Sequence, residues 1–580
     1  MRITRRGYLG LTVAAAGMAA VQTASANASD SATTQESAAA PRGQFVIRNA
    51  GSGGHDYTDA LAALRAYAIA EIDAQGLPGM TLSVTDIDGF VAVLALGWAD
   101  VERRVPLVSE NFFQIGSISK STVALTILAL ADQGRIDLDA PVAKYLPDAA
   151  LPDAPITVAQ LLSHSTGLPD GALLFPRVPD GKLWSGSPPG SHFSYSNTGF
   201  NLLGALIERI TGMSHQDATR KLVREPLGLG EMAGTIREED RARYAVGYWA
   251  YDETASTLPH APLEVAPWNE EDVAAGSIGA TSEVMAKYLR ALMRIGRGQG
   301  APVLSDAAAH RFATPVIKTD DFGPDGRYAC GIAVVPLDGK ICFHHTGGMI
   351  SFTSSFHADA AEGVGCFASV NATIGNYRPR QTTAFAVRLL RAARSGARAP
   401  SAPDPLTAFQ VKKPAPYLGR FVSQQGDVFT LVESAEGLRI GAFGTSGRVA
   451  PSGDSLMTDH PKLTTHLLDP VLEKKNVVGF WWGETLFGRN TPRAQPVPTA
   501  AARALSGVYL NRDPWVGYAT VLARGDKIVA EGLGQLVERN GYWTLAKDAG
   551  GVERFRFDAV LNGRPQRLNA SGVDLWRVTV

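Results

Sequence analysis

Three short groups of residues in this sequence carry the side chains that acyl-transfer chemistry needs. Ser117 and Lys120 lie three positions apart, Tyr195 and Asn197 lie two apart, and a third group runs from His345 to Gly348. A serine beside an amine forms a nucleophile with its base, while phenol, amide and backbone N–H groups move protons and stabilise an oxyanion. The sequence therefore points first to a serine hydrolase.

The first group opens a mostly apolar segment, residues 117–133, that predicts a buried helix ended by Gly134. The i to i+3 spacing places Ser117 and Lys120 on one face of that helix. An apolar environment disfavours the charged ammonium, so Lys120 can be neutral and take the serine proton. The helix N-terminus adds N–H dipoles that favour an oxyanion. A capped helix with an outward-reaching lysine is the alternative interpretation.

The second group supplies a phenol and an amide. We expect Tyr195 and Asn197, two positions apart, to project to the same side of an extended loop. A phenol near a lysine can relay a proton to the leaving group, and an amide can bind a substrate carbonyl. The same spacing occurs at Tyr509 and Asn511, where we expect ordinary strand packing.

The third group ends a predicted strand. Its glycines, Gly347 and Gly348, let a substrate backbone approach, and the Gly348 N–H can face the substrate. Thr346 lies between them and His345, which we expect to supply a donor beside the site. His344 points to the opposite face in this interpretation and is structural.

Together these groups resemble the serine β-lactamase-like hydrolases, which include class C β-lactamases, D-alanyl-D-alanine carboxypeptidases, D-aminopeptidases and related esterases. The matching residues are Ser117-x-x-Lys120, Tyr195-Ser196-Asn197 and His345-Thr346-Gly347, supported by the segments 161–169 and 275–281. The resemblance spans roughly residues 56–398.

The resemblance implies a role for each residue. Ser117 forms the acyl-enzyme, Lys120 and Tyr195 share the general acid and base work, and Asn197 orients the substrate. The N–H groups of Ser117 and Gly348 form the oxyanion hole. Class C β-lactamases begin the third motif with lysine, whereas this chain has His345, as in certain carboxypeptidases and the D-aminopeptidases.

The expected function is therefore that of a peptidase acting on small peptides and tolerating D-residues. An aminopeptidase, a carboxypeptidase and a hydrolase of unusual peptides, such as linearised cyanobacterial toxins, are all consistent with these residues. An esterase or weak β-lactamase is the first alternative. A penicillin- or peptidoglycan-binding protein without turnover is the second alternative. The expected partner is a small peptide or ester, and no cofactor or metal is expected. The chain contains neither H-E-x-x-H nor G-x-S-x-G.

The surrounding pattern predicts an α/β (α+β) domain whose antiparallel sheet is flanked by helices and interrupted by a helical lobe. The expected strands are 80–86, 90–98, 331–336, 340–345, 351–358 and 364–370, with helical segments between 157 and 298 and a helix over 380–394. The first two strands surround the turn Asp86-Ile87-Asp88-Gly89.

Proline-rich linkers divide the remainder of the chain. We expect a catalytic domain over 56–398, a linker over 399–416, and two small antiparallel β-barrels over 417–495 and 503–580. In this order the chain is most similar to D-aminopeptidase, whose last barrel sends a loop toward the active site.

The N-terminus predicts export. Arg5-Arg6 precedes an alanine-rich apolar run and the small-residue site Ala24-Ser25-Ala26, so residues 1–26 resemble a twin-arginine signal peptide and 27–55 a disordered leader. A membrane anchor is the alternative, but the run is short for a spanning helix. We expect a periplasmic or secreted protein.

Composition and cysteine usage limit the partners further. The 55 basic and 56 acidic residues give no electrostatic footprint for nucleic acid or an anionic membrane. Cys330, Cys342 and Cys366 are expected to be buried free thiols, with a bridge between the first two as the alternative. The oligomeric state stays open.

Overall fold

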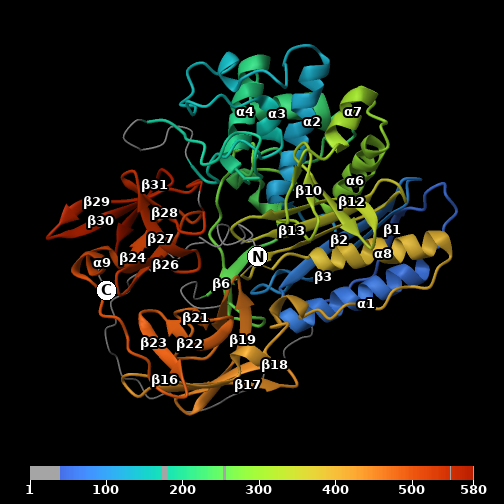
Figure 1. Cartoon of the computed structure of the whole chain (residues 1–580). Helices are drawn as coiled ribbons and strands as arrows, with labels where there is room; N and C mark the ends of the chain where they lie inside the picture. The colour runs from blue at the N-terminus through green and yellow to red at the C-terminus, as the bar shows by residue number, and fades with distance from the viewer. Residues whose placement is uncertain (1–39, 173–180, 252–256, 376, 549, 579–580) are drawn as a thin grey trace.

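The computed structural model describes residues 40–172, 181–251, 257–375, 377–548 and 550–578. The predicted signal peptide and residues 27–39 of the predicted leader lie outside these residues. The expectation of a disordered leader is wrong for its second half, because Val46–Asn49 form a strand that pairs with β3 (Val91–Asp100) at the edge of the sheet. A large domain with a sheet and many helices is followed by two β-barrels that lie beside it (Figure 1). Within the described ranges, no helix has both the length and the apolar character needed to cross a membrane.

A ten-stranded antiparallel sheet forms the centre of the large domain. Its main path runs β1-β3-β2-β14-β13-β12-β11-β10-β9, and β4 pairs with β3. The strands are β1 (Val46–Asn49), β2 (Gly79–Asp86), β3 (Val91–Asp100), β4 (Val105–Pro106), β9 (Ile317–Lys318), β10 (Arg327–Tyr328), β11 (Ala333–Leu337), β12 (Lys340–Gly348), β13 (Thr353–Asp359) and β14 (Val364–Val370). The predicted β2–β3 hairpin is confirmed. Because β14 pairs with β2, both ends of the domain contribute to one sheet, as expected.

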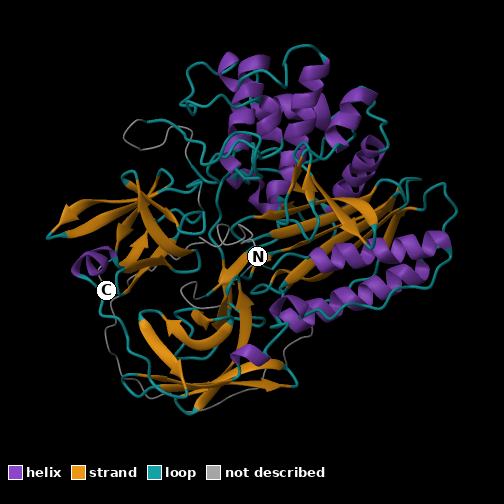
Figure 2. Cartoon of the chain, viewed as in Figure 1, coloured by secondary structure: helices purple, strands orange, loops and turns teal. Residues whose placement is uncertain are grey.

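Helices cover both faces of this sheet (Figure 2). On β14, Phe367 packs into the cluster with α2 and α6, whereas its neighbours Cys366 and Ala368 pack toward α1 and α8. This alternation is the period of two that a strand buried on both faces must have. The helices are α1 (Thr58–Gln75), α2 (Ser119–Asp132), α6 (Ser282–Gly296) and α8 (Arg380–Ser395).

The inserted lobe packs around α2. It contains α3 (Val158–Leu162), α4 (Asn197–Thr211) and α5 (His215–Thr219), and α7 (Asp306–Ala313) packs into the same apolar core. Short strands outside the main sheet form two small sheets, in which β5 (Phe113–Gln114) pairs with β8 (Gly279–Ala280), and β6 (Tyr248–Ala250) pairs with both β7 (Leu263–Val265) and β15 (Ala372–Thr373). The twelve residues from Ser119 to Leu130 are all buried, so the predicted central helix is confirmed. Gly134 follows it with φ of 69°, the left-handed conformation that glycine adopts without strain.

Two closed antiparallel barrels of eight strands complete the chain and confirm the predicted architecture. The first consists of β16 (Gly419–Ser423), β17 (Val428–Ser434), β18 (Gly437–Ala442), β19 (Thr445–Ser452), β20 (Ser455–Thr458), β21 (Leu468–Glu473), β22 (Asn476–Trp482) and β23 (Thr485–Arg489). After α9 (Ala500–Leu505), the second consists of β24 (Gly507–Leu510), β25 (Tyr518–Arg524), β26 (Lys527–Ala530), β27 (Gly534–Arg539), β28 (Tyr542–Leu545), β29 (Phe555–Leu561), β30 (Arg564–Ala570) and β31 (Val573–Arg577). Tyr509 is fully buried in the second barrel, as its predicted packing role requires.

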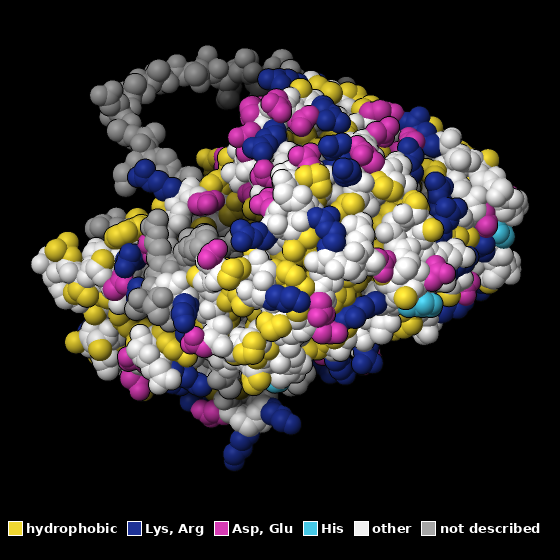
Figure 3. Space-filling model, turned by 90° about the horizontal axis from the view of Figure 1, so that it is seen from above, with side chains coloured by type: hydrophobic (Ala, Val, Ile, Leu, Met, Phe, Trp, Pro, Cys, Tyr) yellow, Lys and Arg dark blue, Asp and Glu magenta, His cyan; other side chains and the backbone are white. Residues whose placement is uncertain are grey.

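The barrels contact each other and the large domain through polar groups, and Trp515 of the second barrel also packs against apolar residues of the large domain. Glu531 of the second barrel accepts hydrogen bonds from the His466 ring and the Leu467 N–H of the first, at 3.0 Å each. The Trp515 indole of the second barrel donates to Glu271 of the large domain. Viewed from above, basic and acidic side chains are interspersed over the surface (Figure 3).

All three cysteines lie within the described residues and are buried and free, which confirms the predicted thiols. Burial raises the pKa of Cys330 and of Cys342 to about 12, so both remain protonated at neutral pH.

Glu71 is a buried carboxyl group between α1 and α8, hydrogen-bonded by the Thr382 hydroxyl. Burial raises its pKa from 4.5 to about 7. The stability this group contributes is therefore fully present below about pH 4.5 and is lost as the pH rises through about 7. We expect Glu71→Gln to raise the thermal midpoint of the large domain by a few degrees at pH 8 and to leave it unchanged at pH 5. A lower midpoint at pH 8 would mean that the ionised carboxylate stabilises the fold.

Candidate active site

Ser117 lies in a single 3-10 turn, Gly116–Ile118, that leads directly into α2. Its side chain is partly exposed, whereas Lys120, one turn on, is completely buried. Lys120 Nζ lies 2.9 Å from Ser117 Oγ. The helical spacing thus brings the amine to the hydroxyl as predicted.

Lys120 has two further partners, and both are carbonyl oxygens. Nζ donates to Asn197 Oδ1 and to the Ala275 carbonyl, at 2.7 Å each. Burial lowers the pKa of Lys120 from 10.5 to about 7, while the negative charge of Asp170 acts in the opposite direction. A neutral amine has two hydrogens and one lone pair. If the hydrogens occupy the two carbonyls, the lone pair is left facing the Ser117 hydroxyl, which is the arrangement a base requires.

Tyr195 completes the group around the nucleophile. Its ring centroid lies 5.0 Å from Lys120 Nζ, and its hydroxyl is close enough to the Ser117 side chain to interact with it. Burial raises the pKa of Tyr195 well above 10, so the phenol is protonated at neutral pH. The ring of His164, 4.3 Å away between centroids, supports it from the lobe. Tyr195 is therefore placed to pass a proton in either direction.

Asn197 differs from its expected setting, because it is the first residue of α4 rather than part of an extended loop. Its backbone N–H and its Nδ2 both donate to Asp170 Oδ1, at 3.0 Å each. An acidic group at a helix N-terminus is electrostatically favourable and satisfies an N–H that has no partner within the helix. The two bonds orient the amide so that its Oδ1 faces Lys120.

The third motif approaches Ser117 through backbone rather than side chains. Gly116 has φ of 54°, and a Cβ on it would lie 2.8 Å from both the N and O atoms of Gly348. A Cβ on Gly347 would lie 1.8 Å from the Ile115 carbonyl oxygen. Only glycine fits at these contacts, so the N–H groups of Ser117 and Gly348 belong to two backbone segments in direct contact.

His345 is not placed as the donor that we expected. It is buried, with Nδ1 2.7 Å from the Thr346 carbonyl and Nε2 3.0 Å from the Tyr328 hydroxyl. Nδ1 must carry the hydrogen to bond a carbonyl, so Nε2 accepts from Tyr328. Burial and the nearby Lys120 lower the pKa of His345 to about 3. His345 is thus an uncharged residue whose two ring nitrogens are both hydrogen-bonded within the protein.

His344 lies on the other side of the strand, as predicted. It is buried, stacks on His357 with 4.1 Å between ring centroids, and hydrogen-bonds the Phe356 carbonyl.

Comparison with known proteins identifies the chain's family. The beta-lactamase family model matches residues 64–389. Penicillin-binding protein 4 of Amycolatopsis lactamdurans is 30% identical over 292 residues, which cover 47% of this chain and 74% of that protein. The chain belongs to the beta-lactamase family. Members of this family are serine hydrolases.

The chain is also similar to an esterase and to a solved penicillin-binding protein homologue. Esterase EstB of Burkholderia gladioli is 32% identical over 182 residues, covering 27% of this chain and 46% of the esterase. The solved structure of an octameric penicillin-binding protein homologue from Pyrococcus abyssi is 21% identical with a TM-score of 0.52. It covers 81% of this chain and 98% of its own, and shows the fold alone.

The structure adds two groups to this beta-lactamase-family site that the motifs had not identified. Asp170 follows directly after the segment 161–169 that supported the resemblance, so its position in the sequence could have identified it as a site residue. The Ala275 carbonyl had no such signal, because a backbone oxygen has no residue type. Its position depends on Asn201, whose Oδ1 accepts the Ala275 N–H at 3.1 Å.

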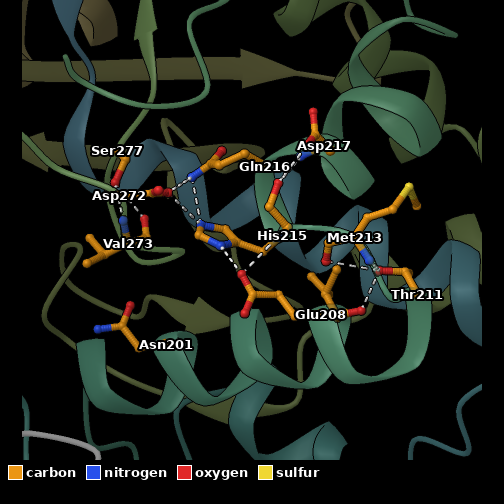
Figure 4. Close-up of polar contacts among 12 residues, drawn as sticks. Asn201, Glu208, Thr211, Met213, His215, Gln216, Asp217, Asp272, Val273 and Ser277 are labelled. Carbon is orange, nitrogen blue, oxygen red and sulfur yellow. Dashed lines mark hydrogen bonds and ion pairs between the residues drawn. The ribbon is translucent and has the colours of Figure 1, made fainter.

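The loop that carries Ala275 is also held from outside (Figure 4). The Ser277 hydroxyl accepts the Val273 N–H, and the ring of His215 lies between Glu208 and the Asp272 side chain. The first contact closes the loop on itself, and the contacts of His215 connect the loop to α4 and α5.

Proposed function

We propose that this chain is a serine hydrolase that forms an acyl-enzyme at Ser117 and cleaves small peptides, including peptides with D-residues. The observation that carries the proposal is the position of Lys120. Its Nζ lies 2.9 Å from Ser117 Oγ in a buried site where two carbonyls take its hydrogens. A pKa of about 7 makes the neutral amine available at physiological pH.

In the first step, Ser117 Oγ attacks the substrate carbonyl carbon and its proton passes to Lys120, directly or through Tyr195. The carbonyl oxygen becomes an oxyanion that accepts hydrogen bonds from the N–H groups of Ser117 and Gly348. When the tetrahedral intermediate collapses, the bond to the leaving nitrogen breaks and Tyr195 delivers a proton to that nitrogen. An ester bond at Ser117 remains.

In the second step, water attacks the ester carbonyl carbon. The same amine and phenol take a proton from the water and return one to Ser117 Oγ, which releases the acid product. Asn197 is placed to bind the substrate beside the scissile bond, since Nδ2 has a second hydrogen besides the one donated to Asp170.

The charges beside the third motif favour a substrate with a carboxylate. His345 is neutral, but Arg380 Nη2 donates to the Thr346 hydroxyl at 3.4 Å. Arg378 lies so close to Gly348 that a Cβ there would be 2.6 Å from its Nη2. Arginine recognises carboxylates well, so this edge suits the C-terminus of a short peptide or the carboxylate of a penicillin.

An esterase is the second candidate, supported by the 32% identity to esterase EstB. Both candidates share the acyl-enzyme and differ in the leaving group, an amine or an alcohol.

A substrate panel tests the proposal. Purified protein is assayed with D- and L-aminoacyl p-nitroanilides, acyl-D-Ala-D-Ala, short p-nitrophenyl esters and nitrocefin. We expect turnover of at least one D-residue peptide, with kcat/KM at least about tenfold above that for nitrocefin. Turnover of esters alone would favour the esterase. Stoichiometric labelling by penicillin without turnover of any substrate would favour a binding protein.

A further inference from the structure

One loop of the second barrel rests against the lobe beside the active site. The Trp184 indole of the lobe donates to the Val552 carbonyl at 2.7 Å, and the Arg554 guanidinium lies 4.9 Å from the centroid of the Trp184 ring. A Cβ on Gly186 would lie 2.3 Å from Val552 Cα, so the two backbones are in contact. The barrel is therefore packed tightly against this part of the lobe.

Between Val552 and Arg554, Glu553 reaches into the lobe. Its side chain is buried, and Oε1 accepts the backbone N–H of Asp170 at 2.9 Å. Its other oxygen accepts the hydroxyl hydrogen of Ser571, within the same barrel. A buried carboxylate bonded in this way fixes the turn that carries Asp170, although 383 residues separate the two partners.

From Asp170 a series of short contacts leads to the nucleophile. Asp170 Oδ1 accepts two hydrogens from Asn197, and Asn197 Oδ1 accepts one from Lys120. Lys120 in turn contacts Ser117. A shift of the Asp170 turn would move the amide that faces the lysine.

We propose that the second barrel helps to position the catalytic groups. Glu553 positions Asp170, and Asp170 positions Asn197 against Lys120. The inference rests on the proposed function, because it assigns these two positioning residues to the Ser117–Lys120 pair. It differs from a loop that enters the cleft, since Glu553 acts through the backbone of the lobe and needs no contact with substrate.

Asp170 has an electrostatic as well as a geometric effect. Its negative charge favours the protonated amine and so holds the pKa of Lys120 above the value that burial alone would produce. Without that charge the amine is neutral at lower pH but is also a weaker base. Asp170 therefore affects both the position of the amide that faces Lys120 and the pH at which the amine loses its proton.

The first test compares variants of two barrel glutamates in the full chain. Glu553→Ala removes the acceptor for the Asp170 N–H, and we expect the rate of Ser117 acylation by a fluorophosphonate to fall about 10- to 100-fold, since small displacements of catalytic groups have effects of this size. Glu553→Gln keeps an acceptor oxygen and should stay within about threefold of the wild type.

Glu531→Ala is the matched control, because Glu531 also accepts a backbone N–H between two units but contacts the first barrel instead of the lobe. Its acylation rate should be that of the wild type. Thermal midpoints of all three variants separate loss of folded protein from loss of rate. Equal acylation rates for Glu553→Ala and Glu531→Ala would overturn the inference.

The second test is the pH profile of Asp170→Asn, which keeps an oxygen facing Asn197 but removes the charge. We expect the acidic limb of kcat/KM, near pH 7 in the wild type, to move to lower pH by about one unit. A limb that does not move would contradict the electrostatic part. Ser117→Ala is included in both tests. If this variant still reacts with the probe, the proposed function is wrong. If Ser117→Ala is unreactive but Glu553→Ala reacts at the wild-type rate, only the proposed role of the barrel is wrong.

Discussion

Replacement of Ser117 by alanine should abolish covalent labelling by a fluorophosphonate or penicillin probe and lower turnover by several orders of magnitude. The hydroxyl is the acyl acceptor in the proposed mechanism. It belongs to a partly exposed residue and lies 2.9 Å from Lys120 Nζ. The substitution removes one atom from a short turn, so the fold should be retained. Intact-mass spectrometry after labelling measures the outcome directly.

Ser119 and Ser121 are the natural controls for this experiment. Both are buried on other faces of the helix, where Ser119 Oγ accepts the Ile278 N–H and Ser121 Oγ donates to the Ile118 carbonyl. Their alanine variants should still be labelled at Ser117. Labelling of Ser117→Ala at another serine would show that the nucleophile has been misassigned.

Replacement of Lys120 by arginine should be as damaging as replacement by alanine, at a cost of several orders of magnitude in kcat/KM. Arginine keeps the positive charge but does not deprotonate in proteins. Since burial lowers the pKa of Lys120 to about 7, the wild-type rate should rise with pH through about 7 as the amine loses its proton. Steady-state kinetics between pH 5 and pH 9 tests both statements.

Arginine is also larger than lysine in a fully buried position, so Lys120→Met serves as a second variant. Methionine follows the shape of the lysine stem without a base and should be equally inactive while folding normally. Near-normal turnover by Lys120→Arg would mean that the site needs only a positive charge and that Tyr195 or another group is the base.

The sequence alone predicted the parts of the protein that depend on local pattern. Runs of apolar and β-branched residues on either side of the turn at 86–89 predicted the β2–β3 hairpin, and similar short runs predicted the strands β12 to β14. The spacing of Ser117 and Lys120 predicted their contact, because three positions along a helix turn the chain by nearly a full circle. The two barrels followed from proline-rich linkers and short β-rich segments.

Only the tertiary structure decided how the remaining groups meet. It placed Asn197 at the start of α4 because Asp170, from a different loop, accepts its N–H. It made His345 an internally bonded neutral residue because Tyr328, on a neighbouring part of the sheet, donates to its ring.

The contact from Glu553 to Asp170 joins residues 383 positions apart, and the partner of Glu553 is a backbone N–H. Contacts of this kind have no spacing and no residue type that a single sequence could reveal. What the sequence determined is the chemistry available on each element. Which of these groups share a proton was decided by the packing of the lobe and the barrel around α2, since burial and distance set the pKa of Lys120 and the orientation of the amide that faces it.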